Sequence, residues 1–450
     1  MEKQPAIKSY FFEKGYKDLR NTIREGWQTN LSEARDNFNQ FETTLPGAFH
    51  FGVGVSIIVF GSIVFGLTSL VHILLLLAVA GVIYFAFSVI WGADKLYRAV
   101  NKIFVACPHA GCYHNFDIPV YHCPNCGVGH TRLHPGPYGI LKRTCQCGAK
   151  LPQTFLNGRK KLYATCPKCE QPIDAKESRP IVIPVIGAPS VGKTCFVTSL
   201  VHQLKEDIAP RDEMLFEFTD EVSKLSYERN LATFEVGSTP LKTVEAQPTA
   251  INIFLQPKNQ TLRRILYLYD PAGEAYLDTT NTQVHRFYNY FHGAFFLIDP
   301  FSIPDFHHEY ADQIDTNSVR PSTEPLEDVY DRIIINLEKN FGIKPHQKVK
   351  APFAVLLTKV DVADLEDKFG QSAGQRIQES DPEKFKTLGE AQHEACREFL
   401  EEYGMGYMLD RFDAKFKNYR FFAVSSAGSN SQGVEEPLRW LFQHIDRKLK

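Results

Sequence analysis

The sequence of 450 residues predicts an α/β protein: a doubly wound domain with a mostly parallel sheet, preceded by a small cysteine-rich module and a hairpin of two apolar helices. Residues 43–93 contain no Asp, Glu, Lys or Arg, and eight of the ten cysteines fall within residues 107–169. A glycine-rich loop then separates an apolar strand from a helical segment near residue 190. These features divide the chain into residues 1–46, 47–93, 101–178 and 180–450.

The net charge of −2 conceals an uneven distribution along the chain. Residues 101–180 carry eleven Lys or Arg against four acids, whereas residues 181–450 sum to −10. A basic middle and an acidic C-terminal part indicate separate domains. We expect no cleavable signal peptide, because a charged, aromatic segment precedes the apolar stretch.

The first 46 residues are predicted to form an amphipathic helix. Apolar residues recur at steps of three or four from Phe12 to Phe41, which places one apolar stripe on a helix. Such a stripe can lie on a bilayer surface, pair with another copy, or pack on the chain's own domains. The sequence leaves these three alternatives open.

The charge-free stretch is predicted to form a transmembrane hairpin. Residues 49–70 and 73–91 each match the ~20 apolar residues that cross a bilayer once, with a short connector at 68–72. Basic residues flank both ends, so the positive-inside rule places both termini and the C-terminal domain in the cytoplasm. The alternative is a buried helical pair in a soluble core, which the lack of a polar stripe disfavours.

The cysteine-rich module is predicted to bind two structural zinc ions. Its cysteines form four close pairs, namely Cys107 and Cys112, Cys123 and Cys126, Cys145 and Cys147, and Cys166 and Cys169. Neighbouring thiolates suit two corners of a zinc tetrahedron, at ~2.3 Å from the metal. The spacing does not tell which pairs share a metal, and His109 or His114 can replace a ligand at the first pair. The alternatives are a disulfide framework, which cytoplasmic placement disfavours, and free thiols.

Basic residues of this module suggest a partner. Lys142-Arg143 and Arg159-Lys160-Lys161 are candidates for contact with anionic lipid headgroups next to the bilayer. A merely solvated surface and a protein partner are alternatives, and nucleic acid is not favoured.

The glycine-rich loop is a complete phosphate-binding motif. It lies between a predicted strand at 180–186 and a predicted helix from residue 193 to about 206, which is the context that the motif requires. Its amides would cradle phosphates, Lys193 would reach the β/γ oxygens, and the Thr194 hydroxyl would ligate Mg²⁺. The expected nucleotide-binding residues here are Gly187, Ala188, Pro189, Ser190, Val191, Gly192, Lys193, Thr194 and Cys195.

Three further predicted strands end in polar residues. The strand at 264–269 ends at Asp270, a candidate magnesium ligand through water, followed by Gly273, whose amide can sense the γ-phosphate. The strand at 354–357 ends in Thr358, Lys359 and Asp361; the last carboxylate can accept from N1 and the 2-amino group of guanine. The strand at 421–424 precedes Ser425, Ser426 and Ala427, whose backbone can contact the guanine O6.

This ordered set resembles the Ras-like and translation-factor class of P-loop GTPases, over residues 180–450. With zinc knuckles ahead of it, the chain is also similar to bacterial double-GTPase proteins, which implies a role in conflict systems. The resemblance implies GTP or GDP with Mg²⁺ as cofactors. Glu274 stands where Ras-like enzymes have a water-orienting Gln, so unaided hydrolysis is expected to be slow. Thr243 is the first candidate for the switch threonine, with Thr239 and Thr249 as competitors.

The sequence therefore predicts a membrane-anchored GTPase switch that hydrolyses Mg-GTP to GDP, with an unidentified protein effector or regulator. One alternative is a membrane ATPase, which Asp361 disfavours. Another is a zinc-ribbon adaptor or scaffold that binds guanine nucleotide with little turnover.

Overall fold

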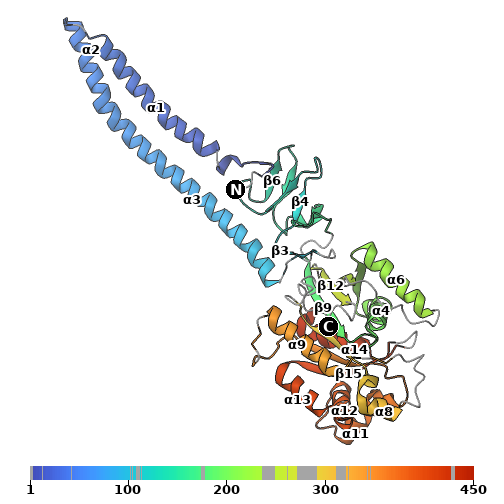
Figure 1. The fold of residues 1–450 in the computed structure, drawn as a ribbon. Helices are drawn as coiled ribbons and strands as arrows, with labels where there is room; N and C mark the ends of the chain where they lie inside the picture. The colour runs from blue at the N-terminus through green and yellow to red at the C-terminus, as the bar shows by residue number, and fades with distance from the viewer. Residues whose placement is uncertain are drawn as a thin grey trace. The chain divides into compact units, whose positions relative to one another are not determined.

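The computed structural model describes residues 4–12, 14–41, 43–101, 103, 105–107, 112, 114–173, 178–235, 249–260, 262–270, 291–310, 321–322, 324–341, 343–344, 346–426 and 431–449. Two compact units make up the chain, Met1–Ile103 with Ile118–Pro172, and Phe104–Asp117 with Ile173–Lys450. Figure 1 shows the path of the chain through both. We refer to them as the helix–cysteine unit and the sheet unit.

Seven described strands of the sheet unit form one sheet in the order β10-β11-β12-β9-β13-β14-β15. Their bounds are β9 Arg179–Gly187, β10 Met214–Phe218, β11 Thr249–Pro257, β12 Arg264–Asp270, β13 Ala294–Ile298, β14 Phe353–Leu357 and β15 Tyr419–Ala423. The strands from β12 to β15 pair in parallel, and β10 and β11 pair antiparallel at one edge. Each strand predicted from the sequence is present, within two residues of its expected bounds.

Helices cover both faces of this sheet, because its central strands are apolar on both sides. The described helices of the unit are α4 Lys193–Gln203, α5 Ala209–Arg211, α6 Glu221–Glu235, α8 Pro304–Tyr310, α9 Leu326–Phe341, α10 Leu365–Phe369, α11 Gln371–Ser380, α12 Leu388–Glu402, α13 Gly406–Lys415 and α14 Glu435–Ile445. A π-helical turn, η4 (Leu204–Ile208), extends α4, and short 3₁₀ turns lie at η6 (Pro300–Ser302) and η8 (Arg447–Leu449). A two-residue pair, β2 (Val105–Ala106) with β3 (Asn115–Phe116), belongs to the same unit.

Side chains of a strand point alternately to the two faces of the sheet, and this alternation distinguishes two packed layers here. Ile183 and Val185 share a buried cluster with Leu200 of α4 and Leu441 of α14. On the opposite face, the ring of Phe296 in β13 packs against Phe412 of α13. The predicted doubly wound arrangement is therefore present, with the carboxyl ends of five parallel strands at one edge.

In the helix–cysteine unit, η1 (Tyr10–Phe12) leads into α1 (Lys14–Asn39), which packs on the apolar helix of its own chain. Trp27 Nε1 donates to Ser69 Oγ at 3.0 Å, and the ring of Phe12 meets that of Tyr84 edge-on at 5.4 Å. Of the three alternatives for the amphipathic stripe, the structure shows packing within the chain.

The apolar stretch forms one continuous helix, made of α2 (Leu45–Ser56), a π-helical turn η2 (Ile57–Gly61) and α3 (Ser62–Val100). The predicted two-helix hairpin was wrong on this point: residues 68–72 lie inside α3. The weakly polar residues do not break the helix. Thr68 Oγ1 donates to the carbonyl of Val64 at 2.9 Å, so this hydroxyl has a hydrogen-bond acceptor within the helix itself. Among the described residues, the single helix Leu45–Val100 is long and apolar enough to cross a membrane, by length and composition.

Short strands build the rest of this unit. They form two small sheets, β1-β6-β7 and β5-β4-β8, with bounds β1 Ala6–Ile7, β4 Val120–His122, β5 Gly129–His130, β6 Lys142–Cys145, β7 Lys150–Pro152 and β8 Ala164–Thr165. The N-terminal β1 pairs antiparallel with β6, and near the C-terminal end of α3 Asp94 accepts from the amide of Phe155 at 2.9 Å. The segment before α1 and the last turns of α3 are thus both attached to the cysteine-rich module.

Candidate functional site

The phosphate-binding loop follows β9 directly and leads into α4. Gly187 has to be glycine, because a Cβ there would lie 2.9 Å from the carbonyl oxygen of Leu297 on the neighbouring β13. Gly192 caps α4 with φ of 95°, a left-handed conformation that glycine adopts without strain. Ser190 also has a positive φ, 64°, so the loop doubles back over the helix N-terminus. The sequence motif therefore has the strand–loop–helix geometry expected of it.

Lys193, the first residue of α4, is buried and folds back over the loop. Its Nζ donates to the carbonyl oxygens of Gly187 at 2.9 Å and Ala188 at 2.8 Å. The ammonium therefore lies within the loop that would surround a phosphate, held by neutral acceptors that an anion outcompetes. Thr194 is half-buried at the start of the helix, at the position predicted to ligate Mg²⁺. The donor set fits a Mg-nucleotide.

The loop after β15 contacts α4, and the loop after β14 contacts the end of β15. Ser199 Oγ of α4 donates to the carbonyl of Ser426 at 3.2 Å, and a Cβ on Gly192 would lie 4.0 Å from Ser426 Oγ. Val360 N donates to the carbonyl of Val424 at 3.4 Å, which joins the two predicted base-binding loops. Asp361 is exposed beside them. Segments predicted to bind phosphate and base thus gather at one edge of the sheet.

Several predicted residues lie outside the described residues. These are Thr239, Thr243, Gly273, Glu274 and Ala427. Asp270 ends β12 beside β9, on the same edge as the loop, and Thr249 begins β11, but their side chains are not among those described. Their roles in switching and magnesium binding stay predictions.

Sequence reasoning missed Asp299, which is fully buried at the end of β13 and whose Oδ2 lies 2.7 Å from Lys359 Nζ. A signal was present: an acid follows the wholly apolar strand 294–298 and precedes Pro300, a pattern typical of a helix N-cap. Its Oδ1 accepts from Phe301 N at 3.1 Å, as such a cap does.

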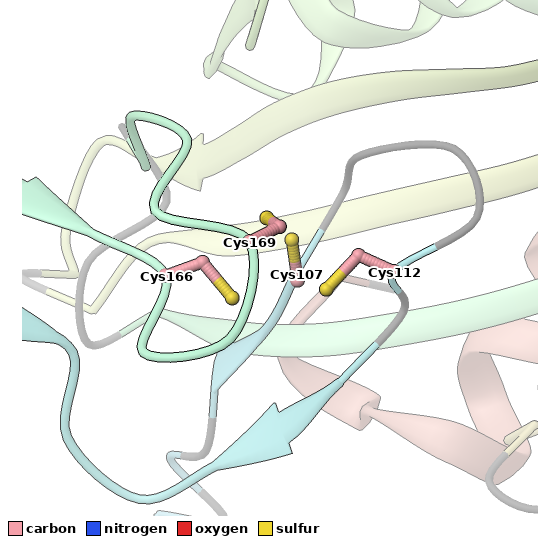
Figure 2. Close-up of side chains that lie close together, drawn as sticks. All are labelled: Cys107, Cys112, Cys166 and Cys169. Carbon is pink, nitrogen blue, oxygen red and sulfur yellow. The ribbon is translucent and has the colours of Figure 1, made fainter.

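The eight cysteines of the module gather in two groups of four, each with its Sγ atoms within 4.8 Å of one another. One group is Cys123, Cys126, Cys145 and Cys147; the other is Cys107, Cys112, Cys166 and Cys169, drawn in Figure 2. The second pair in sequence thus joins the third, and the first joins the fourth. This nested arrangement is the one among the open alternatives that the structure selects.

The first group, within the helix–cysteine unit, fits a zinc tetrahedron. The Sγ atoms of Cys123 and Cys147 lie 3.5 Å apart, and those of Cys126 and Cys145 3.6 Å apart. Zinc–sulfur bonds of ~2.3 Å in a tetrahedron separate sulfurs by about 3.8 Å. Burial opposes ionisation of Cys123, but hydrogen bonds from the backbone of Cys126 and Asn125 and from neighbouring thiols lower its pKa to about 7. The chemistry of this donor set therefore suits zinc.

A left-handed residue after three of the pairs makes each pair converge. Gly127 follows Cys126 with φ of 71°, Gly148 follows Cys147 with φ of 90°, and Glu170 follows Cys169 with φ of 59°. The turn lets the second thiol swing back beside the first. All ten cysteines lie in the described part of the chain, and none of them forms a disulfide there.

Two members of the predicted basic surface are interior residues. Arg143 and Arg159 are almost fully buried, and Arg159 donates to the carbonyls of Leu133 and Gln153, each at 2.8 Å. Three lysines, Lys142, Lys160 and Lys161, are exposed. The charge available to an anionic partner is therefore smaller than the sequence suggested.

Fold and loop together define a P-loop nucleotide-binding domain of the α/β class. A family model described as Double-GTPase 2 matches residues 181–440, more than half of the chain, so the chain belongs to the Double-GTPase 2 family. This confirms the resemblance inferred from the motifs, and it supports the binding of guanine nucleotide.

Comparison with solved structures gives a distant match to "Structure of methanosarcina barkeri Roco2 RocCORdC bound to GDP". The sequence identity is 11%, the TM-score is 0.25, and the match covers 60% of this chain and 51% of that chain. No curated protein matches the chain.

Proposed function

We propose that this protein is a membrane-anchored GTPase switch that binds Mg-GTP and hydrolyses it to GDP. The observation that carries the proposal is the convergence of the phosphate-binding loop with the loops of Asp361 and Ser426 at one edge of a parallel sheet. Ligands of open α/β sheets bind at such an edge, where neighbouring connections diverge to opposite faces. β9 is that point here, since it lies between β12 and β13.

Each residue has a distinct role in the proposal. The loop amides and Lys193 hold the β- and γ-phosphates and stabilise the charge that develops on them. Thr194, with Asp270, would hold Mg²⁺, which supplies charge neutralisation when bound. The Asp361 carboxylate accepts from two donors of guanine that adenine does not present together. Glu274 in place of Gln leaves the attacking water poorly oriented, so turnover is slow without a partner.

Base preference tests the nucleotide assignment. The wild type is expected to bind GDP at least a hundredfold more tightly than ADP, since lost charged hydrogen bonds each cost about 1.5–3 kcal/mol. Asp361→Asn should shift preference towards xanthosine diphosphate, whose ring offers the complementary acceptor. Equal affinity of the wild type for ADP and GDP would refute the assignment. Single-turnover hydrolysis of GTP separates a slow GTPase from an adaptor that only binds nucleotide.

The membrane part of the proposal rests on the apolar helix. Its 56 residues span about 84 Å at ~1.5 Å per residue, well beyond a hydrocarbon core of about 30 Å. Lys17, Arg20 and Arg24 lie on the exposed side of α1, so α1 has to separate from α3 when the apolar helix inserts. A continuous helix that crosses the bilayer once separates the residues before it from those after it, so we place the C-terminal domain in the cytoplasm and the N-terminus on the other side, which requires β1 to leave β6 on insertion.

Reporters test this topology in intact cells. Of two fluorescent reporters, the one fused to the C-terminus should be protected from external protease and the one fused to the N-terminus should be cleaved. Protection of both reporters would contradict a single crossing, and a protein recovered wholly in the soluble fraction would contradict membrane anchoring. The zinc ions are proposed to be structural, since four thiolates leave no position for a substrate.

A further inference from the structure

Asp299 is a buried carboxylate that no part of the predicted GTPase motif set includes. Its side chain is inaccessible to solvent, yet its two oxygens accept from three donors. Oδ1 accepts from Phe301 N at 3.1 Å, and Oδ2 accepts from Ser322 N at 2.8 Å and from Lys359 Nζ at 2.7 Å. Removing a carboxylate from water costs several kcal/mol, so this group has to be held by such partners.

Its charged partner, Lys359, belongs to the predicted base-binding loop and has an unusual backbone. With φ of 61° it lies in the left-handed region, which is strained for a residue that carries a Cβ. Its ammonium also lies 5.9 Å from the centre of the Phe301 ring. Buried charge and local strain of this kind concentrate at functional sites, where the surrounding structure enforces them.

The strained residue starts a short turn that presents Asp361. Thr358 N donates to the carbonyl of Ile298 at 3.0 Å, and Val362 N donates to the carbonyl of Lys359 at 3.0 Å. Val360 is buried, whereas Asp361 is exposed. The direction of the Asp361 side chain therefore depends on how Lys359 is held at the beginning of the turn.

We propose that Asp299 is a positioning residue for base recognition: through its ion pair with Lys359 it fixes the turn that aims Asp361 at the N1 and 2-amino groups of guanine. This inference rests on the proposed guanine binding by Asp361. Asp299 does not touch the base in this scheme. Removing the Asp299 carboxylate is expected to weaken the two hydrogen bonds between Asp361 and guanine, and to leave phosphate binding intact.

The test compares GDP with inosine diphosphate, which lacks the 2-amino group. Affinities are measured by competition with a fluorescent GDP analogue on the full-length protein. The wild type is expected to prefer GDP about tenfold or more, because GDP makes one additional charged hydrogen bond. In Asp299→Asn the preference for GDP should fall to about that of Asp361→Ala, because the affinity for GDP decreases more than the affinity for inosine diphosphate. Asp328→Asn, an exposed change on α9, should keep the wild-type ratio.

A structural role alone predicts a different result. If Asp299→Asn weakens both nucleotides by the same factor, or changes neither, the inference is overturned. Lys359→Met provides a second variant should Asp299→Asn not fold: it keeps the aliphatic chain without the ammonium and should lose the same preference. A Lys359→Met protein that retains the wild-type ratio also overturns the inference. A wild type that binds no GDP instead refutes the proposed function itself.

Discussion

The two units of this protein are stabilised in different ways. The sheet unit has a large continuous core that includes Phe196, Leu266 and Phe295, all inaccessible to solvent. Among the described residues, the cysteine module has a small core cluster of six buried residues, two of which are themselves candidate metal ligands: Tyr121, Cys123, Leu133, Cys145, Leu151 and Ala164. Apolar burial contributes roughly 25 cal/mol per Å², so the small module needs other stabilisation. Thiolate clusters and buried arginines supply it.

This difference has a consequence for function. A domain with its own core can place strained and charged residues, such as Lys359 and Asp299, at its loop edge without unfolding. The cysteine module has a much smaller core, so we expect its thiolate clusters to contribute to folding rather than to catalysis. The comparison leads to four predictions, from the largest expected effect to the smallest.

Metal removal is the strongest test of the comparison. Chelation at pH 7 should unfold the cysteine module, since structural zinc contributes about 10–16 kcal/mol in small zinc domains, while the sheet unit keeps binding GDP. Purified protein should contain about two zinc ions per chain, one per thiolate group. Metal analysis and limited proteolysis measure these outcomes.

Matched cysteine variants make this test specific. Cys123→Ser should lose metal, whereas Cys396→Ser, a buried cysteine outside both groups, should keep the full zinc content. Zinc content near zero, together with disulfides among the eight cysteines, would refute the metal assignment.

Buried carboxylates in the two units provide a matched pair. Asp94 lies 3.5 Å from the buried Arg159, and Asp446 lies 3.0 Å from the buried Arg264. Replacing either acid with Ala leaves an uncompensated charge and should cost about 3–5 kcal/mol. We expect Asp94→Ala to melt the cysteine module at physiological temperature and Asp446→Ala to leave the sheet unit folded. Hydrogen exchange, read separately for each unit, distinguishes the two; equal resistance of both units would contradict the comparison.

Acid should destabilise the sheet unit through His393. Burial, helped by Arg397 and Arg420, lowers the pKa of His393 to about 4, and its Nδ1 accepts from Phe421 N at 3.0 Å. The neutral ring is favoured in the folded state, so its contribution is complete above the unfolded pKa of about 6.5 and is lost as pH falls towards 4. The loss is up to about 3 kcal/mol.

Denaturant titrations between pH 7 and 4 measure this effect. His393→Gln should show a shallower dependence of unfolding free energy on pH than the wild type, whereas His346→Gln, an exposed site, should match the wild type. Identical slopes for all three proteins would exclude His393 as the titrating group.

The smallest effect concerns the turn after Cys169. Glu170 has φ of 59°, where the corresponding residues after two other pairs are Gly127 and Gly148. Glu170→Gly should relieve about 1 kcal/mol of backbone strain, partly offset by the flexibility of glycine when unfolded. Gly148→Glu should destabilise the protein, because it introduces the same backbone strain. Thermal melts of the zinc-loaded protein compare them, and a destabilised Glu170→Gly would show that the strain is absent.

The sequence by itself determined the features that depend on neighbouring residues. The glycine loop, the strands that end in Asp270, Thr358 and Ser425, and the close cysteine pairs are local patterns, since turn geometry and strand burial restrict which residues can occupy them. The family assignment followed from their order.

Only the tertiary structure decided features that join distant segments. The pair that contains Cys123 lies beside the pair that contains Cys147. Asp299 binds Lys359, which is 60 residues further along the chain. Arg159 is buried and donates to backbone carbonyls instead of lying on a basic surface. The apolar stretch became one helix, in which Thr68 bonds to the helix's own backbone and Ser69 accepts from Trp27 of α1. Spacing along the chain carries no information about such contacts, because they depend on which packing arrangement buries the most apolar surface while leaving no charge unpaired.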